Sequence, residues 1–177
     1  LLAKTLYGIG ESVSHDDGRT WDEITDWQHM TPGRFFIWRL VSGNLLLVRH
    51  DEIGEPPKGR QNVMAFLSED DGNTWQGGLE LDGRGALEQQ GSGVSYPDGT
   101  QAPDGRIYVI NDYNRWDEKE IVMHVFTEED VLARRFESKA AKPMVLVNKA
   151  EGMNMRHGRG FTGYQQRGLA REGKIKE

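Results

Sequence analysis

Several short apolar segments of the chain end in charged or ring-bearing side chains, and such ends could carry chemistry. Asp112 and Arg115 follow one such segment, at the kind of strand end where binding sites are often built. A histidine beside an arginine, as in the pair Arg49–His50, could give or take a proton near neutral pH. For each residue taken alone, an ion pair or turn contact at the surface is the alternative. The polar residues that could face a common pocket are Arg39, His50, Arg84, Asp112 and Arg115.

Composition and motifs argue against several other chemistries. Acidic residues outnumber basic ones by 28 to 22, so a nucleic-acid partner is not expected. Cysteine is absent, which fits a cytoplasmic protein and is also compatible with a secreted or periplasmic one. There is no histidine pair at metal-ligand spacing and no apolar run of membrane-spanning length. Gly8-Ile9-Gly10 lacks the third glycine of a dinucleotide loop. We therefore predict no metal, no cofactor and no membrane span.

A repeated eight-residue motif indicates the hairpins that would position these side chains. Ser14-His15-Asp16-Asp17-Gly18-Arg19-Thr20-Trp21 and Ser68-Glu69-Asp70-Asp71-Gly72-Asn73-Thr74-Trp75 agree at six of eight positions. In each copy, Ser and Asp side chains can bond nearby backbone N–H groups, and Gly supplies a positive φ. We predict a hairpin turn at each copy, with the Trp ring under the turn. An EF-hand calcium loop is rejected, because apolar residues stand at two of the positions where it needs ligands. The predicted structural positions are Ser14, Asp16, Gly18, Trp21, Ser68, Asp70, Gly72 and Trp75.

This repeat closely resembles the Asp-box (BNR repeat) of sialidases and related β-propeller proteins. The resemblance implies an all-β fold, with about two and a half blades of a propeller that is six-bladed in that family. It places the boxes at the blade periphery, where they identify the architecture and say little about activity.

Strand-like segments agree with this fold. We expect strands over 4–13 and 21–27 around the first box, and one complete four-stranded blade over roughly 34–82. The unbroken apolar run 45–50 suggests a strand covered on both faces. In the next blade, strands are expected at 94–96, 106–113, 120–126 and 144–147, with a short helix capped by Thr127. The predicted domain covers 1–147, and the basic, Gly-rich segment 148–177 is expected to be a disordered or peripheral extension, or alternatively an arm that binds polyanions.

The resemblance also implies a site. The apolar strand that ends at Arg49 is similar to a family strand whose arginine grips the substrate carboxylate, a task that suits a planar guanidinium. The alternative for Arg49 is an ion pair with Asp51. Tyr96 falls at the place of the sialidase nucleophile, whose phenol needs a basic neighbour to react at neutral pH. The candidates are therefore Tyr96 and Asp98 as catalytic residues and Arg49, His50, Arg39, Arg115 and Arg34 as substrate-binding residues.

The chain departs from the family pattern at one point. The glutamate that activates the family's tyrosine would lie near Arg34, and no Glu stands there. Two functions are therefore carried forward. The first is a sialidase-like glycoside hydrolase, or a fragment of one, that acts on a terminal sugar, either acidic or neutral. The second is a non-catalytic carbohydrate-binding or scaffold propeller.

A partial propeller would expose apolar blade faces. Because the sequence starts without Met inside an apparent strand, we expect either a missing N-terminal half or self-association to complete the ring.

Overall fold

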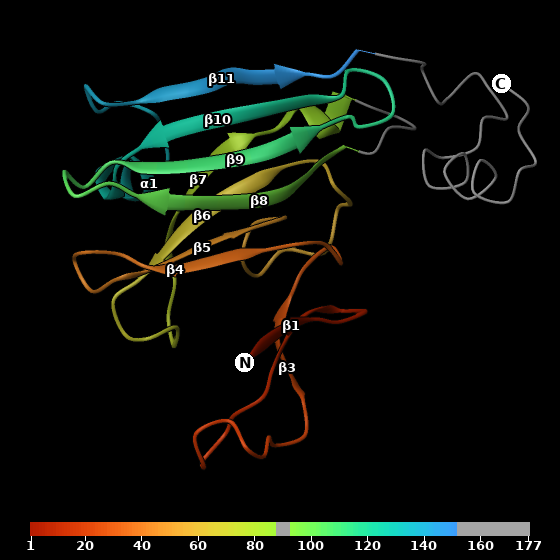
Figure 1. The fold of residues 1–177 in the computed structure, drawn as a ribbon, viewed down its shortest axis with the longest axis vertical. Coiled ribbons are helices and arrows are strands. Elements are labelled where there is room, and N and C mark those ends of the chain that lie inside the picture. Colours follow the sequence, from red (N-terminus) through yellow and green to blue (C-terminus); the bar gives the residue numbers. More distant parts are fainter. Residues whose placement is uncertain (88–92, 152–177) are drawn as a thin grey trace, which may run out of the picture.

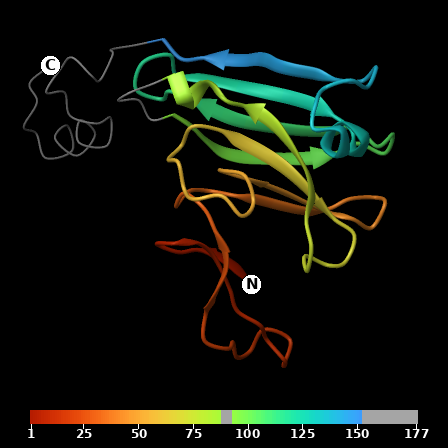
Figure 2. The same ribbon diagram turned by 180° about the vertical axis from the view of Figure 1, so that it is seen from behind.

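The computed structural model describes residues 1–87 and 93–151, and β-sheet dominates this part of the chain. Three antiparallel sheets follow one another along the sequence and are stacked in that order (Figures 1 and 2). One short α-helix and one 3-10 turn complete the regular structure of the described residues. The all-β expectation is confirmed. No helix in the described ranges is long and apolar enough to cross a membrane.

The first sheet has the order β1 (Leu2–Lys4), β2 (Gly8–Glu11) and β3 (Thr25–His29). The single strand expected over 4–13 is wrong, because the chain turns at 5–7 and makes two strands of this segment. The Thr5 amide donates to the Gly8 carbonyl across this turn. Gly8 is required there, since a Cβ would lie 2.1 Å from the Gln28 carbonyl oxygen. The strand expected from Trp21 begins later, at Thr25.

The second sheet is a four-stranded meander in the order β4-β5-β6-β7, as predicted for residues 34–82. Each strand pairs with the next along the chain, so chain direction alternates across the sheet. The bounds are β4 (Phe36–Arg39), β5 (Leu45–Arg49), β6 (Val63–Ser68) and β7 (Gln76–Asp82).

The third sheet repeats the meander, in the order β8-β9-β10-β11. The predicted helix is present, with Thr127 as N-cap and Asp130 completing a capping box. The last strand continues to Lys149, past the expected domain boundary at 147. Most of the predicted extension, residues 152–177, lies outside the described residues. The elements are η1 (Arg84–Leu87), β8 (Val94–Gln101), β9 (Ile107–Tyr113), β10 (Glu120–Phe126), α1 (Glu128–Ala133) and β11 (Lys142–Lys149).

Two apolar clusters hold the three sheets together. The larger lies between the second and third sheets and includes Leu46 and Val48 of β5. The smaller joins the first sheet to the second through Ile9, Met30 and Leu47. Successive residues of β5 therefore enter different clusters, which is why its sequence is continuously apolar.

The two Asp-boxes form nearly identical turns. The first lies between β2 and β3 and the second between β6 and β7. In the second, Asp70 Oδ1 accepts from the Thr74 amide at 2.8 Å and Oδ2 accepts from the Thr74 hydroxyl at 2.6 Å. In the first, Asp16 makes the corresponding bonds to Thr20 at 2.8 and 2.7 Å. Each of these hydrogen bonds is local, so the eight residues of a box can close the turn between themselves.

Glycine and tryptophan complete each box. Gly18 and Gly72 have φ of 83° and 92°, in the region that favours glycine. The indole Nε1 of Trp21 donates to the Gly18 carbonyl at 3.2 Å, and that of Trp75 donates to the Gly72 carbonyl at 3.1 Å. The predicted turn chemistry of the boxes is confirmed.

The alternating strand directions give the stacked second and third sheets two distinct ends. Strands β4, β6 and β8 begin at one end, where β5, β7 and β9 finish, and we call this the Tyr96 end. The Val94 amide donates to the Arg60 carbonyl at 3.0 Å and holds the two sheets together there. The second Asp-box and the hairpin between β4 and β5 lie at the opposite end, the box end.

Candidate functional site

The chain leaves regular pairing at Tyr96. Ser95 pairs with Asp112 and Asp98 pairs with Ile110, so Tyr96 and Pro97 together oppose a single residue in a β-bulge. Tyr96 has φ of 54°, a left-handed conformation uncommon for a large side chain. Such local strain is concentrated at functional positions. The bulge turns the tyrosine outward, and 45% of its surface is exposed.

Two guanidinium groups face this ring. The Arg115 Cζ atom lies 4.4 Å from the ring centroid, and that of Arg34 lies 5.9 Å from it. Arg34 is exposed and immediately precedes the second sheet, whereas Arg115 follows β9 in the third. The three residues therefore form a cationic and aromatic cluster at the Tyr96 end, which we call the Tyr96 cluster.

Charge around the ring changes its acidity. The Arg115 guanidinium lowers the pKa of the Tyr96 phenol, first by a hydrogen bond and then by its positive charge. The charge of Arg60 acts in the same direction, and the carboxylate of Asp112 acts against it. The effect is favourable for a phenol that must lose its proton to react.

Asp112 and Arg115 form an ion pair, Oδ2 to Nη2 at 3.1 Å. Burial raises the pKa of the Asp112 carboxyl, and the charges of Arg115 and Arg60 partly offset this rise. The pair suggested by the sequence at this strand end is therefore present, and it adjoins Tyr96.

Arg49 has different surroundings. Its guanidinium is fully buried and donates to Gln28 Oε1 at 2.9 Å and to the backbone carbonyls of His29 and His50. Burial lowers its pKa to about 10. Asp51, the alternative partner, instead accepts from the amides of Thr31 and Lys58. Arg49 thus joins the second sheet to the first, and its role toward a ligand stays a prediction.

Three other predicted site residues, His50, Arg39 and Asp98, are not members of the Tyr96 cluster. His50 is buried, and its Nδ1 donates to the Asn62 carbonyl at 2.7 Å. Arg39 lies at the box end, where its Nη2 bonds Asp71 at 2.7 Å. It stands five residues from Arg34 along one extended segment, about 16 Å away at strand spacing. Asp98 is exposed two residues beyond Tyr96, and its carboxylate accepts from the Gly99 amide.

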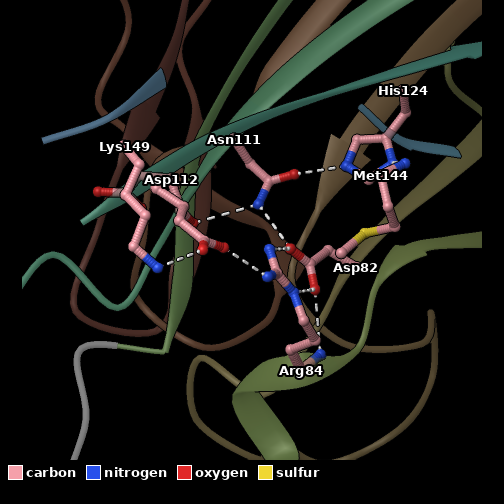
Figure 3. A network of polar contacts seen from close by, with 8 residues as sticks. Asp82, Arg84, Asn111, Asp112, His124, Met144 and Lys149 are labelled. Atoms are coloured by element: carbon pink, nitrogen blue, oxygen red, sulfur yellow. Dashed lines mark hydrogen bonds and ion pairs between the residues drawn. The ribbon is translucent and has the colours of Figure 1, made fainter. Parts of the chain in front are cut away.

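A second polar network lies behind the Tyr96 cluster, and of its side chains the sequence analysis named Arg84 but neither Asp82, Asn111, Glu120 nor His124. Figure 3 shows Asn111 between the side chains of Asp82 and His124. Its Nδ2 donates to Asp82 Oδ2 at 3.0 Å, and its Oδ1 accepts from His124 Nε2 at 2.8 Å. Arg84 bonds both Asp82 oxygens and also Glu120. This network crosses β7, β9 and β10, so no local pattern could have revealed it.

The network includes a stacked cation. The Arg84 Cζ atom lies 3.8 Å from the centroid of the Tyr113 ring. Glu120, which accepts from Arg84, also accepts from Lys149 Nζ at 3.0 Å and so brings in β11. With its charges paired in this way, the network serves to align the strands. Among the described residues there is no group of three or more potential metal ligands.

Comparison with known protein families agrees with the two boxes. Residues 4–109 match the model of the BNR repeat-like domain. The match contains both Asp-boxes, Arg34 and Tyr96, and it ends before Asp112 and Arg115. No curated protein and no solved structure matches the chain.

Proposed function

Since the chain belongs to the BNR repeat-like domain family, we propose that it is a sialidase-like glycoside hydrolase, or part of one, that acts on a terminal acidic sugar. We further propose that the three sheets are about two and a half blades of a sialidase-type propeller. The second box joins the last two strands of a four-stranded sheet, and the first box likewise joins the last two strands of its sheet. By this comparison, the first sheet corresponds to the three outer strands of a blade.

The observation that carries the functional proposal is the Tyr96 cluster. An exposed phenol is flanked by two guanidinium groups, and neither Arg34 nor Arg115 is fully buried. A planar guanidinium can bind a carboxylate through two parallel hydrogen bonds. A sugar whose carboxylate is held by these arginines would place its anomeric carbon beside the Tyr96 oxygen.

The chemistry would use the phenolate as a nucleophile. Its oxygen would form a bond to the anomeric carbon while the glycosidic bond breaks, and the departing oxygen would take up a proton. A water would then attack the anomeric carbon as its bond to the Tyr96 oxygen breaks, and the proton that this water loses would balance the one taken up by the departing oxygen. The lowered pKa of Tyr96 increases the fraction of phenolate at neutral pH. Asp98 remains the second catalytic candidate, since it is exposed on the same strand.

One observation supports a non-catalytic alternative. The first hydrogen-bond partner of the Tyr96 phenol is the Arg115 guanidinium, a cation that cannot accept a proton, and the Asp112 carboxylate is paired with that same guanidinium. A carbohydrate-binding propeller with the same cluster would hold an acidic sugar without cleaving it.

The test uses a fluorogenic aryl glycoside of sialic acid. Tyr96→Phe keeps the ring and should abolish turnover while binding of the free acidic sugar, measured by calorimetry, changes little. Tyr108→Phe is the matched control, because Arg106 faces that ring on the same sheet at 5.8 Å. Unchanged turnover in Tyr96→Phe would overturn the proposal. Saturable binding without turnover in the unmodified protein would support the binding alternative.

A further inference from the structure

Asp112 stands where the bulge and the cationic cluster meet. It pairs with Ser95 across the two strands, directly before the bulged residue Tyr96. Three residues further along the chain, Arg115 turns back so that its Nη2 reaches Asp112 Oδ2 at 3.1 Å. The same guanidinium lies 4.4 Å from the Tyr96 ring centroid. Asp112 is therefore linked to the strand of Tyr96 by strand pairing, and its carboxylate contacts the Arg115 guanidinium that lies over the Tyr96 ring.

The ion pair is placed to act as a restraint. Arg115 lies after the end of β9, outside the strand pairing that fixes Asp112. Arginine has several rotatable bonds, and an unrestrained side chain at a strand end would sample many rotamers. The side chains of Arg115 and Asp112 are only 29% and 22% exposed, so solvent screens this pair less than a fully exposed one.

We propose that Asp112 is a positioning residue of this site, which holds the Arg115 guanidinium against the Tyr96 ring through their ion pair. The inference rests on the function proposed for the Tyr96 cluster, but its test needs neither ligand nor turnover. Without Asp112, the guanidinium would lose the carboxylate that draws it toward the tyrosine's strand, and it would spend less time against the Tyr96 ring.

The proposal predicts the direction in which the pKa of Tyr96 should move when Asp112 is removed. The charged groups that face Tyr96 are Arg34 before β4, Arg60 before β6, Asp112 on β9 and Arg115 after it. As a bare negative charge, Asp112 opposes ionisation of the phenol, so its loss should lower the pKa of Tyr96. As a positioning residue, it keeps Arg115 in place, so its loss should raise that pKa. The two roles therefore predict opposite shifts.

The experiment follows the phenol directly. The protein is labelled with tyrosine carrying ¹³C at Cζ, and the Tyr96 signal, assigned with Tyr96→Phe, is titrated by NMR at alkaline pH, where Asp112 is ionised. In Asp112→Asn the Tyr96 pKa should rise toward the ordinary tyrosine value. Asp112→Glu keeps the charge and should restore part of the difference. A pKa that falls or stays constant in Asp112→Asn would overturn the proposal.

Two further variants isolate the restraint. Arg115→Gln should raise the Tyr96 pKa by itself, and adding Asp112→Asn to it should give no further rise. A further rise in the double variant would show that Asp112 acts on Tyr96 by another route and would overturn the proposal. The matched control is Asp104→Asn, which breaks the 2.6 Å ion pair with Arg106 elsewhere on the third sheet. This control should leave the Tyr96 titration unchanged, and a shift of equal size would also overturn the proposal.

Discussion

Arg49 Nη1 donates to Gln28 Oε1 at 2.9 Å, and this bond ties the end of β5 to the end of β3. The guanidinium also donates to the His29 carbonyl in the first sheet and to the His50 carbonyl in its own segment. Its hydrogen-bond acceptors are all neutral, whereas the carboxylates of Asp51 and Glu52 act on the guanidinium through their charge alone. A buried cation with this many partners contributes to stability chiefly by satisfying carbonyl and amide oxygens that cannot reach water.

We expect Arg49→Met to lower the free energy of unfolding by roughly 2–4 kcal/mol, because it leaves several buried acceptors without donors. Urea denaturation followed by tryptophan fluorescence measures this change. Arg39→Met is the control, since Arg39 pairs with Asp71 at the exposed box end and should matter by about 1 kcal/mol or less. Equal effects of the two substitutions would contradict the structural role. Full stability with lost binding of an acidic sugar would instead support the role that the resemblance implies.

The Asp-boxes could be predicted from sequence because the hydrogen bonds that close each turn stay within eight residues. Ser68, Asp70 and Thr74 bond one another and the backbone between them, and so do their counterparts in the first box. The N-terminal hairpin was missed because its turn at 5–7 carries no Gly or Pro of its own. Its requirement for Gly8 comes from the carbonyl of Gln28, in a strand much later in the chain.

The site was only partly predictable, because its residues are also brought together by contacts between distant parts of the chain. Tyr96, Arg34 and Arg115 could each be named as candidates, but they come from separate segments of two sheets. Sequence shows that a strand ends in Arg49, yet not that another sheet covers its guanidinium. Arg60 could have been added from its place just before β6, at the Tyr96 end, where β4 of the second sheet and β8 of the third also begin.

We expect the chain to self-associate through the outer face of the third sheet. Ile110 and Ile121 are each 38% exposed there, and Ile110 and Met123 line an open groove of about 510 Å³ with Tyr108. A sheet from another copy of the chain, packed on this outer face, would remove apolar surface from water. The chain's own second sheet does the same on the inner face.

Sedimentation velocity should therefore give a concentration-dependent mass above that of one chain. Ile110→Lys places a charge on the outer face and should shift the distribution toward monomer. Leu132→Lys is the control, because Leu132 is 47% exposed on α1, outside this face. A stable monomer at every concentration would contradict the prediction, as would equal effects of the two lysines.

The buried network makes stability depend on pH through His124. The Met144 amide donates to Nδ1 at 3.3 Å, so this nitrogen is unprotonated and Nε2 carries the hydrogen that is donated to Asn111. The ring is fully buried and neutral, and burial lowers its pKa from 6.5 to about 4. Between these values the unfolded chain binds a proton that the folded chain does not. Stability therefore rises with pH through this window and falls as pH drops from 6.5 toward 4.

The size of this effect follows from the two pKa values. At pH 5 the linkage should have removed about 2 kcal/mol of the unfolding free energy that is present at pH 7. Burial lowers the pKa of His50 as well and acts in the same direction, so a variant is needed to assign the effect. His124→Gln offers a neutral amide that can donate and accept at once. It should be less stable than the parent at pH 7 and should lose less stability on acidification.

The control for this prediction is a substitution that removes apolar packing without changing the titration of His124. Ile9 is buried in the smaller apolar cluster, away from His124, and Ile9→Ala should destabilise the fold by an amount that does not change between pH 7 and 5. Unfolding free energies of the three proteins at both pH values decide the matter. If the difference between His124→Gln and the parent is the same at pH 7 and pH 5, His124 is not the titrating group. An imidazole that titrates near 6.5 in the NMR spectrum of the folded protein would lead to the same conclusion.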